Sequence, residues 1–382
     1  MAMARLPLQT RVAYDSQVFS LQSHGGISRY FSELIKNFRE APELGVEPVL
    51  TFTRSNNQHL ATTGSRVMSP RMVPNWTDRL RRYPVLNDQL EQYVTGHHAQ
   101  QSDILHATYY RPLTRDLRSS SKLAITVVDL IPEILGLRGA DNPHLGKAAL
   151  IERADLILTI SEATTAQLRH FYPTLQCPII TTPLAVAPSV FSPEQRGSAP
   201  AITPPAFPYV LFVGRRGGYK NFAVLASALR TLVSRGSDLG LVIAGAPLSS
   251  DELALLDYLP VSRLLVSRAD DRILANLYRN ARAFVFPSRL EGFGLPLLEA
   301  MESGCPVVAS DIQVFREVAG DAAEFFDPSD ADALASAIER VQGSTRRAQL
   351  VAAGTRNAQR FSWEATAEGT AAAYRLVTQH GA

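Results

Sequence analysis

The chain has 382 residues, of which 46% are hydrophobic and 19% charged, and its formal net charge is +2. These values exclude a disordered, collagen-like or coiled-coil protein, and at roughly 100–200 residues per domain they predict two globular domains. The near-neutral charge gives no general attraction for nucleic acid, so no nucleic-acid partner is expected.

Cysteine spacing, the N-terminal residues and the length of apolar segments bear on where the protein is located. The two cysteines, Cys177 and Cys305, lie far apart and fit neither a disulfide framework nor a zinc site, which indicates a reducing compartment. Residues 1–10 contain too few apolar residues for a signal peptide. No segment stays apolar over the roughly 18 residues of a membrane span. We therefore expect a cytoplasmic protein.

Short β-branched runs alternate with amphipathic stretches of about 10–15 residues, the pattern of βαβ units in parallel α/β sheets. In the first half, strands are expected at Arg11–Tyr14, Pro48–Phe52, Ile104–Ala107, Leu123–Val128 and Leu156–Ile160, and helices at Ile27–Arg39 and, after the N-cap Ser161, Glu162–Phe171. In the second half, strands are expected at Tyr209–Val213, Gly240–Ala244, Leu264–Ser267, Ala283–Phe286, Val307–Ser310 and Ala323–Phe326. Two Rossmann-like sheets fit this series better than one long sheet.

Prolines, glycines and serines gather between residues 188 and 208, which is typical of a linker. We expect an N-terminal domain over residues 1–190, a linker over 191–207 and a C-terminal domain over 208–362. The segment from Trp363 onward is predicted to be helical.

A glycine-rich basic turn, Gly214-Arg215-Arg216-Gly217-Gly218-Tyr219-Lys220, follows a predicted strand and precedes a predicted helix. Backbone N–H groups, a helix N-terminus and cations together favour binding of a phosphate. The spacing fits neither G-x-G-x-x-G nor the P-loop, so a dinucleotide oxidoreductase and a P-loop NTPase both lose their fingerprint. A tight turn with solvated charges is the alternative interpretation.

A second glycine-bracketed loop, Glu291-Gly292-Phe293-Gly294-Leu295-Pro296, follows the predicted strand Ala283–Phe286. Pro296 is tolerated in the first turn of a helix, so a helix is expected to begin there. Glu291 would then precede the helix while Glu299 lies within its first two turns. The two carboxylates can serve one ligand from two ends, although a carboxylate near a helix N-terminus also stabilises the helix itself.

Four further residues lie where α/β sheets bind ligands, at the carboxyl ends of strands. Gly25 and Gly26 follow the first strand and open the first helix, either to let another group approach closely or because the turn needs positive φ. His106 and Asp129 each end a later predicted strand and are expected to meet at the same edge. A histidine with a purely structural role is the alternative.

Together these motifs resemble the family 4 retaining glycosyltransferases with the GT-B fold. Glu291–Glu299 is similar to the E-x7-E signature of that family, and Val213–Lys220 to its phosphate-binding loop. A bacterial, mannosyltransferase-like branch that builds surface polysaccharides is indicated by Asp15–Phe19, Gly25–Phe31, His106–Tyr110, Asp129–Glu133 and Gly218–Phe222. One departure is Val128, because His or an aromatic residue often precedes the aspartate in this branch.

The resemblance implies two Rossmann-like domains facing across a cleft, with the acceptor held by the first domain and a nucleotide sugar by the second. It also implies that the last helix, about residues 363–382, crosses back onto the N-terminal domain. The residues that it implies for donor binding are Gly25, Gly26, Gly214, Arg215 or Arg216, Lys220, Phe293, Gly294, Leu295 and Glu299.

Catalysis is expected from Glu291, Lys220 and Arg215, with Asp129 and His106 on the acceptor side. The resemblance implies that the configuration of the anomeric carbon is retained by front-face attack, in which the leaving phosphate takes the acceptor's proton. Glu291 or Asp129 as nucleophile or base is the alternative. Because no D-x-D motif lies in a donor-loop context, neither a metal nor another cofactor is expected.

The sequence therefore predicts transfer of a hexose, in the first place mannose from GDP-mannose, onto a lipid-linked or growing glycan of an O-antigen or exopolysaccharide. The alternatives are a UDP-sugar donor and a non-catalytic GT-B scaffold. Nucleotide-sugar epimerases share the architecture but would not carry this pairing of motifs. Five arginines between Arg66 and Arg82 form either a contact with the anionic inner face of the plasma membrane or a solvated face.

Overall fold

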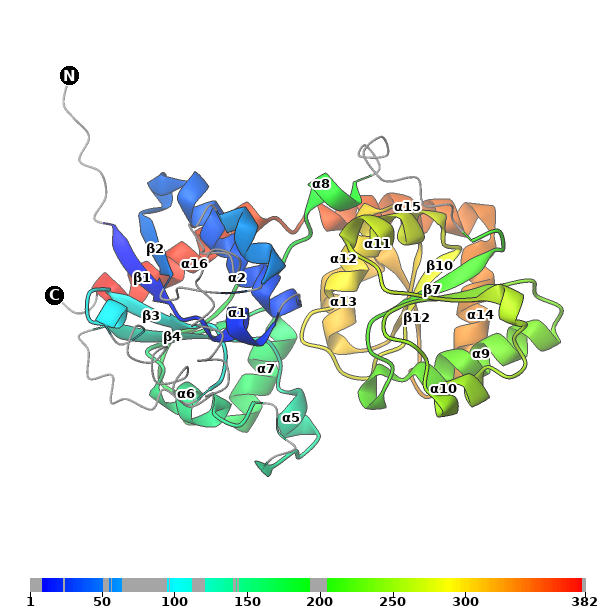
Figure 1. Ribbon diagram of the computed structural model, residues 1–382, viewed down its shortest axis with the longest axis horizontal. Coiled ribbons are helices and arrows are strands. Elements are labelled where there is room, and N and C mark those ends of the chain that lie inside the picture. Colours follow the sequence, from blue (N-terminus) through cyan, green and yellow to red (C-terminus); the bar gives the residue numbers. More distant parts are fainter. Residues whose placement is uncertain are drawn as a thin grey trace, which may run out of the picture. The chain divides into compact units, whose positions relative to one another are not determined.

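Figure 1 shows the computed structural model of the chain. The structure describes residues 9–22, 25–50, 55, 57–63, 95, 97–111, 121–139, 142, 144–192 and 205–379. The chain divides into a first unit, Met1–Leu184 with Trp363–Ala382, and a second unit, Ala185–Ser362. The arginine patch between Arg66 and Arg82, and residues 193–204 of the expected linker, lie outside the described residues.

In its described part, the first unit is built on a six-stranded parallel sheet with the strand order β2-β1-β3-β4-β5-β6. The strands are β1 (Thr10–Tyr14), β2 (Val46–Leu50), β3 (Ile104–Ala107), β4 (Lys122–Val127), β5 (Leu156–Thr159) and β6 (Ile179–Thr181). Its helices are α1 (Gln17–Leu21), α2 (Gly26–Glu40), α5 (Ile131–Ile134), α6 (Lys147–Arg153), α7 (Glu162–Phe171) and α16 (Trp363–Thr378), with 3-10 turns at Pro42–Leu44 and Gln58–Thr63. The predicted strand Pro48–Phe52 thus begins two residues earlier, and β6 was not predicted.

Helix α16 packs against α2 and β1, although it lies far from both in the sequence (Figure 1). Its Tyr374 ring contacts Phe38 of α2 at 6.1 Å between centroids, and its hydroxyl lies 2.8 Å from that of Tyr14 in β1. At the start of α16, the Thr366 hydroxyl donates to the carbonyl of Pro183, 2.6 Å away. The chain therefore leaves and re-enters the first unit at one place.

The second unit contains a six-stranded parallel sheet with the order β12-β11-β10-β7-β8-β9. The strands β7 (Tyr209–Val213), β8 (Gly240–Ala244), β9 (Leu264–Ser267), β10 (Ala283–Phe286), β11 (Val307–Ser310) and β12 (Ala323–Phe326) have the predicted bounds, which are confirmed. Its helices are α8 (Pro188–Phe191), α9 (Phe222–Ser234), α10 (Ser250–Leu255), α11 (Asp271–Asn280), α12 (Leu295–Glu302), α13 (Gln313–Ala319), α14 (Ala331–Gln342) and α15 (Ser344–Ala358), with 3-10 turns at Gly218–Lys220, Val261–Arg263 and Gly320–Ala322.

Helices cover both faces of the second sheet (Figure 1). Helices α9 and α14 pack together and bury Leu225 and Ile338 against Phe212 and Val285 of the sheet. Helix α12 packs against both α11 and α15, and Tyr278 of α11 packs against Phe284 of β10. Burial on both faces explains why the central strands β7, β8 and β10 are continuously apolar.

Side-chain caps determine where several helices begin. The predicted N-cap Ser161 is confirmed, because its hydroxyl accepts a hydrogen bond from the amide of Thr164. Ser249 and Glu252 form a capping box at α10, and Asp270 and Asp330 cap α11 and α14. No helix in the described part of the chain is long and apolar enough to span a bilayer.

The strand order locates the positions where each sheet binds ligands. In the second unit the chain runs from β7 outward to β9 and then returns to β10 on the other side of β7. In the first unit, β2 and β3 likewise lie on opposite sides of β1. Open α/β sheets bind ligands outside the carboxyl ends of the strands at such a switch point. In the second unit, a ligand site is therefore expected at the loops after β7 and β10.

Candidate active site

The loop after β7 has a backbone that requires glycine at its start. Gly214 has φ of 105°, and its amide donates to the carbonyl of Ala244 at 2.9 Å. A Cβ on the neighbouring Gly245 would lie 2.7 Å from the Gly214 carbonyl oxygen, so the two loops approach closely. At the other end of the loop, the Asn221 side chain donates to the carbonyls of Pro287 and Pro328 at 3.0 and 2.7 Å. This ties the loop after β7 to the end of β10.

Lys220 and Glu291 meet between these two loops. The ammonium nitrogen of Lys220 lies 2.6 Å from Glu291 Oε1, and the side chains are 21% and 12% exposed. The ammonium also lies 5.3 Å from the ring centroid of Tyr219 and 5.7 Å from that of Phe286. The Arg289 amide donates to the Tyr219 carbonyl at 2.8 Å, which adds a backbone link. A half-buried ion pair therefore occupies the switch point of the second sheet.

The structure distinguishes the two adjacent arginines that the sequence left as alternatives. Arg216 is buried, and its Nε and Nη2 donate to the two carboxylate oxygens of Glu252 at 2.8 and 3.1 Å. This bidentate contact holds the pKa of Glu252 below its usual range. Arg215 is exposed and makes no ion pair within the described part of the chain. Of the two, Arg215 therefore presents its guanidinium to solvent.

The N-terminus of α12 follows Glu291. Gly294 is the N-cap residue with φ of 96°, and a Cβ there would lie 2.9 Å from the ring of Phe315, so both conformation and space require glycine. Leu295 is the first helical residue. The Phe293 ring is buried against Phe361, so only the backbone of Phe293 can serve a ligand.

Glu299 lies in the second turn of α12 and is buried. The Tyr278 hydroxyl donates to its Oε2 at 3.3 Å. Burial, together with this nearby carboxylate, raises the pKa of Tyr278 well above its ordinary value. The two glutamates of the predicted motif thus lie before and within α12, as the spacing predicted.

Gly25 and Gly26 lie at the start of α2 in the first unit. Gly25 has extended backbone with φ of 174°, so the interpretation that it needs positive φ is wrong. A Cβ at Gly25 would collide with the Gln22 side chain, whose Oε1 accepts a hydrogen bond from the Ser28 amide at 3.3 Å. The space around Gly26 is open. The close approach at Gly25 is therefore to Gln22.

His106 does not lie at the surface. It is fully buried, with Nδ1 2.6 Å from the Tyr374 hydroxyl and Nε2 2.9 Å from the Thr126 hydroxyl. Burial lowers its pKa to about 3, so the ring is neutral at pH 7. The expectation of a catalytic His106 beside Asp129 is corrected, because both ring nitrogens are used inside the core and neither contacts Asp129.

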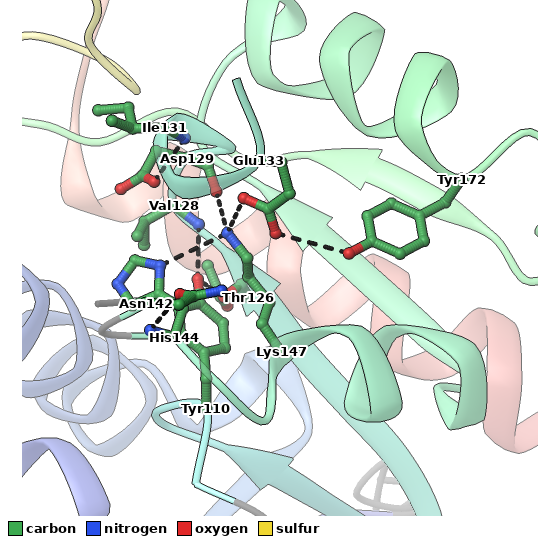
Figure 2. A network of polar contacts seen from close by, with 10 residues as sticks. All are labelled: Tyr110, Thr126, Val128, Asp129, Ile131, Glu133, Asn142, His144, Lys147 and Tyr172. Atoms are coloured by element: carbon green, nitrogen blue, oxygen red, sulfur yellow. Dashed lines mark hydrogen bonds and ion pairs between the residues drawn. The ribbon is translucent and has the colours of Figure 1, made fainter. Parts of the chain in front are cut away.

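Asp129 belongs to a different polar network, shown in Figure 2. Its Oδ1 accepts from the Ile131 amide at 3.0 Å, and its carbonyl accepts from the Lys147 ammonium at 2.9 Å. Lys147 also pairs with Glu133 and contacts His144. Sequence reasoning missed Lys147 and His144, because a lysine and a histidine around the start of a helix look like surface residues until their burial is known.

No group of three or more His, Cys, Asp or Glu side chains suited to a metal ion occurs among the described residues. The groups that the second unit brings to this site are Lys220, Arg215, Glu291, Glu299 and the amides that begin α12.

The sequence of this region is similar to that of known glycosyl transferases. Residues 176–357 match the family Glycosyl transferases group 1. The chain is 30% identical over 246 residues to the O-antigen chain mannosyltransferase B of Escherichia coli, covering 59% of this chain and 62% of that protein. It is 32% identical over 177 residues to the phosphatidyl-myo-inositol mannosyltransferase of Mycolicibacterium smegmatis, covering 45% of this chain and 46% of the relative.

The solved structures show the fold. Sucrose-phosphate synthase from Thermosynechococcus elongatus superposes with a TM-score of 0.71 at 22% identity, covering 98% of this chain and 100% of that one. The two parallel six-stranded sheets and this structural likeness identify the GT-B fold, as predicted from the sequence.

Proposed function

We propose that this protein is a retaining, metal-independent glycosyltransferase that moves mannose from GDP-mannose onto a lipid-linked or growing glycan during synthesis of a surface polysaccharide. The observation that carries the proposal is the Lys220–Glu291 pair at the switch point of a group 1 glycosyl transferase domain. The choice of mannose is supported by the names of two relatives, both mannosyltransferases.

Charge at this site matches what transfer from a nucleotide sugar requires. As the bond between the anomeric carbon and the diphosphate breaks, negative charge develops on the departing phosphate. Lys220, the exposed Arg215 and the backbone N–H groups that begin α12 supply fixed positive charge there. Because these groups are part of the protein, the departing charge can be stabilised without a metal ion.

Glu291 orients the transferred sugar, since its carboxylate already lies against Lys220 and can accept a sugar hydroxyl beside the diphosphate. Buried Glu299 accepts the ribose hydroxyls. In front-face transfer the acceptor oxygen bonds to the anomeric carbon on the side from which the diphosphate leaves. The departing phosphate oxygen takes the proton of the acceptor hydroxyl, so the transfer requires no protein nucleophile.

The location that we propose is the cytoplasmic side of the plasma membrane, with peripheral contact through the basic residues between Arg66 and Arg82. Co-sedimentation with vesicles of anionic lipid tests this contact. Neutralising Arg79, Arg81 and Arg82 should release the protein, and unchanged sedimentation would remove the membrane contact without affecting the proposed chemistry.

Thermal unfolding with GDP, UDP, ADP and dTDP, each with and without EDTA, tests the donor site. At a hundredfold excess over Kd, a ligand stabilises the fold by about 2.7 kcal/mol, which raises Tm by roughly 5–10 °C for a unit of this size. We expect GDP to do so with EDTA present, and the shift to shrink in Lys220→Met but not in the control Lys122→Met, whose ion pair with Asp155 is in the first unit.

The other outcomes are equally informative. Stabilisation by UDP instead of GDP would replace the proposed donor with a UDP-sugar. Stabilisation by no nucleotide would contradict a catalytic protein and favour the scaffold interpretation. A shift that disappears on chelation and returns with Mg²⁺ would contradict metal independence.

A further inference from the structure

Lys147 is a lysine that is almost completely buried, with a side chain only 1% exposed. Its ammonium lies 2.8 Å from Glu133 Oε2, 2.9 Å from the carbonyl oxygen of Asp129 and 3.4 Å from Nδ1 of His144 (Figure 2). Lysine is rarely buried in this way unless it is paired, because removing the ammonium from water is costly. One cation therefore holds the loop after β4, helix α5 and the turn before α6 together.

The contact with Lys147 sets the tautomer of His144. An ammonium group only donates hydrogen bonds, so Nδ1 of His144 accepts and the proton of the neutral ring is on Nε2. The ring is also held edge-on against Tyr110 at 4.7 Å and Tyr109 at 5.6 Å between centroids. His144 is half-buried, and its Nε2 makes no hydrogen bond within the described part of the chain. The ring thus presents an oriented N–H donor.

Asp129 supplies an acceptor in the same network. Its Oδ1 is used by the Ile131 amide, whereas its other oxygen makes no hydrogen bond within the described ranges. The Tyr110 hydroxyl holds the loop after β4, because it donates to the Thr126 carbonyl and accepts from the Val128 amide, both at 3.0 Å. Asp129 and His144 contact the same ammonium group, since Lys147 Nζ lies 2.9 Å from the Asp129 carbonyl oxygen and 3.4 Å from His144 Nδ1. A fixed donor and a fixed acceptor therefore lie together beyond the end of β4.

We propose that Asp129 and His144 bind one hydroxyl group of a polyol acceptor, and that Lys147 is the positioning residue that fixes both. This inference rests on the proposed transferase function. A sugar hydroxyl is both donor and acceptor, so it can donate to the free Asp129 oxygen while it accepts from His144 Nε2–H. The network is in the first unit, whereas the Lys220–Glu291 pair is in the second. The role of Lys147 is to keep Nδ1 of His144 an acceptor.

Binding of methyl α-mannoside, followed by saturation-transfer NMR in the presence of GDP, tests the hydroxyl site. We expect His144→Ala to weaken binding about fivefold to tenfold, the loss expected for one hydrogen bond. His144→Gln should recover part of the loss, since its amide restores an N–H donor. His170→Ala, an exposed histidine on α7, is the matched control and should bind like the wild type.

The role of Lys147 is tested by titrating His144 in an NMR experiment. The charged and titratable groups around the ring are Asp129 and Glu133, which raise its pKa, Lys147, which lowers it, and Tyr109 and Tyr110, which pack on it. With burial as the largest cause, the net effect lowers the pKa of His144. In Lys147→Met the pKa should rise and methyl α-mannoside should bind at least fivefold more weakly, whereas the control Lys122→Met should change neither.

Equal binding of methyl α-mannoside by wild type and His144→Ala would overturn the hydroxyl site, and so would absence of binding by a wild type that GDP stabilises. An unchanged His144 pKa in a folded Lys147→Met variant would overturn the positioning role. If Lys147→Met does not fold, the comparison of His144→Ala with His144→Gln still decides the hydroxyl site. Absence of stabilisation by every nucleotide would contradict the proposed function instead, which keeps the two failures distinct.

Discussion

Replacing Lys220 by methionine removes one charge while keeping nearly the same length of side chain. At the departing diphosphate, loss of one preorganised electrostatic contact typically lowers kcat by about 10²–10³-fold, or about 3–4 kcal/mol of activation free energy. The folded state loses less. Breaking a fully buried pair costs about 3–5 kcal/mol, but Lys220 and Glu291 are 21% and 12% exposed, so solvent screening reduces the cost to about 1–2 kcal/mol.

These two magnitudes separate a role in catalysis from a role in folding. Steady-state rates with the nucleotide sugar give the change in kcat, and urea unfolding gives the change in free energy. Glu291→Gln and the double variant complete a cycle. Because the residues are in contact at 2.6 Å, the effects of the two substitutions on unfolding should not add.

The control is Lys122→Met, which breaks an ion pair with Asp155 at 3.1 Å in the first unit and should leave kcat unchanged. A Lys220→Met variant that keeps kcat/KM within threefold of the wild type would refute the assignment of the donor site. A variant that loses activity and unfolding free energy in equal measure would show that the pair serves the fold.

Three further outcomes are expected. Arg215→Ala should raise the KM for the nucleotide sugar at least tenfold without changing the unfolding free energy. Arg216→Ala should instead lower the unfolding free energy by about 1–3 kcal/mol, because Glu252 loses its bidentate partner. The reverse pattern would contradict the assignment of Arg215 to the donor and Arg216 to the fold. Chelation with EDTA should change kcat less than twofold, and a loss that Mg²⁺ restores would be contrary. Because the pKa of His106 is about 3 in the folded protein, below pH 6.5 the unfolded chain binds a proton at this residue that the folded chain does not. The unfolding free energy should therefore fall as the pH falls, and His106 should contribute about 1.4 kcal/mol per pH unit to this slope. Urea unfolding between pH 7 and 5 measures this slope, which should become smaller in His106→Gln; an equal slope would contradict the buried neutral ring.

The fold was predictable where the sequence signal is local. The central strands β7, β8 and β10 of the second unit are apolar throughout and are followed by glycine or proline, so their bounds followed from composition. Strand β6 was not predictable in this way, because Ile179–Thr181 is three residues long and half-buried at the edge of the sheet. The cap at Ser161 was predictable because it depends on residues a few positions away.

Of the site, only the residues in loops that follow predicted strands could be recognised from the sequence. Both loops that bring Lys220 and Glu291 together follow strands, so each was recognisable alone. The choice between Arg215 and Arg216 was not recognisable, since it depends on Glu252 in another helix. Burial of His106 depends on Tyr374, 268 residues later. Such long-range contacts leave no mark on the residues around a motif.

The return of α16 affects the order in which the protein is built on the ribosome. Every residue of the second unit has been synthesised once residue 362 is added, whereas the first unit still lacks its final helix. Until that helix arrives, the His106 ring and the Tyr14 hydroxyl have no Tyr374 to bond. Domains generally fold as units, so the half of the chain made first is completed last. A nascent chain stalled before Trp363 would therefore carry a folded second unit beside an unfinished first one.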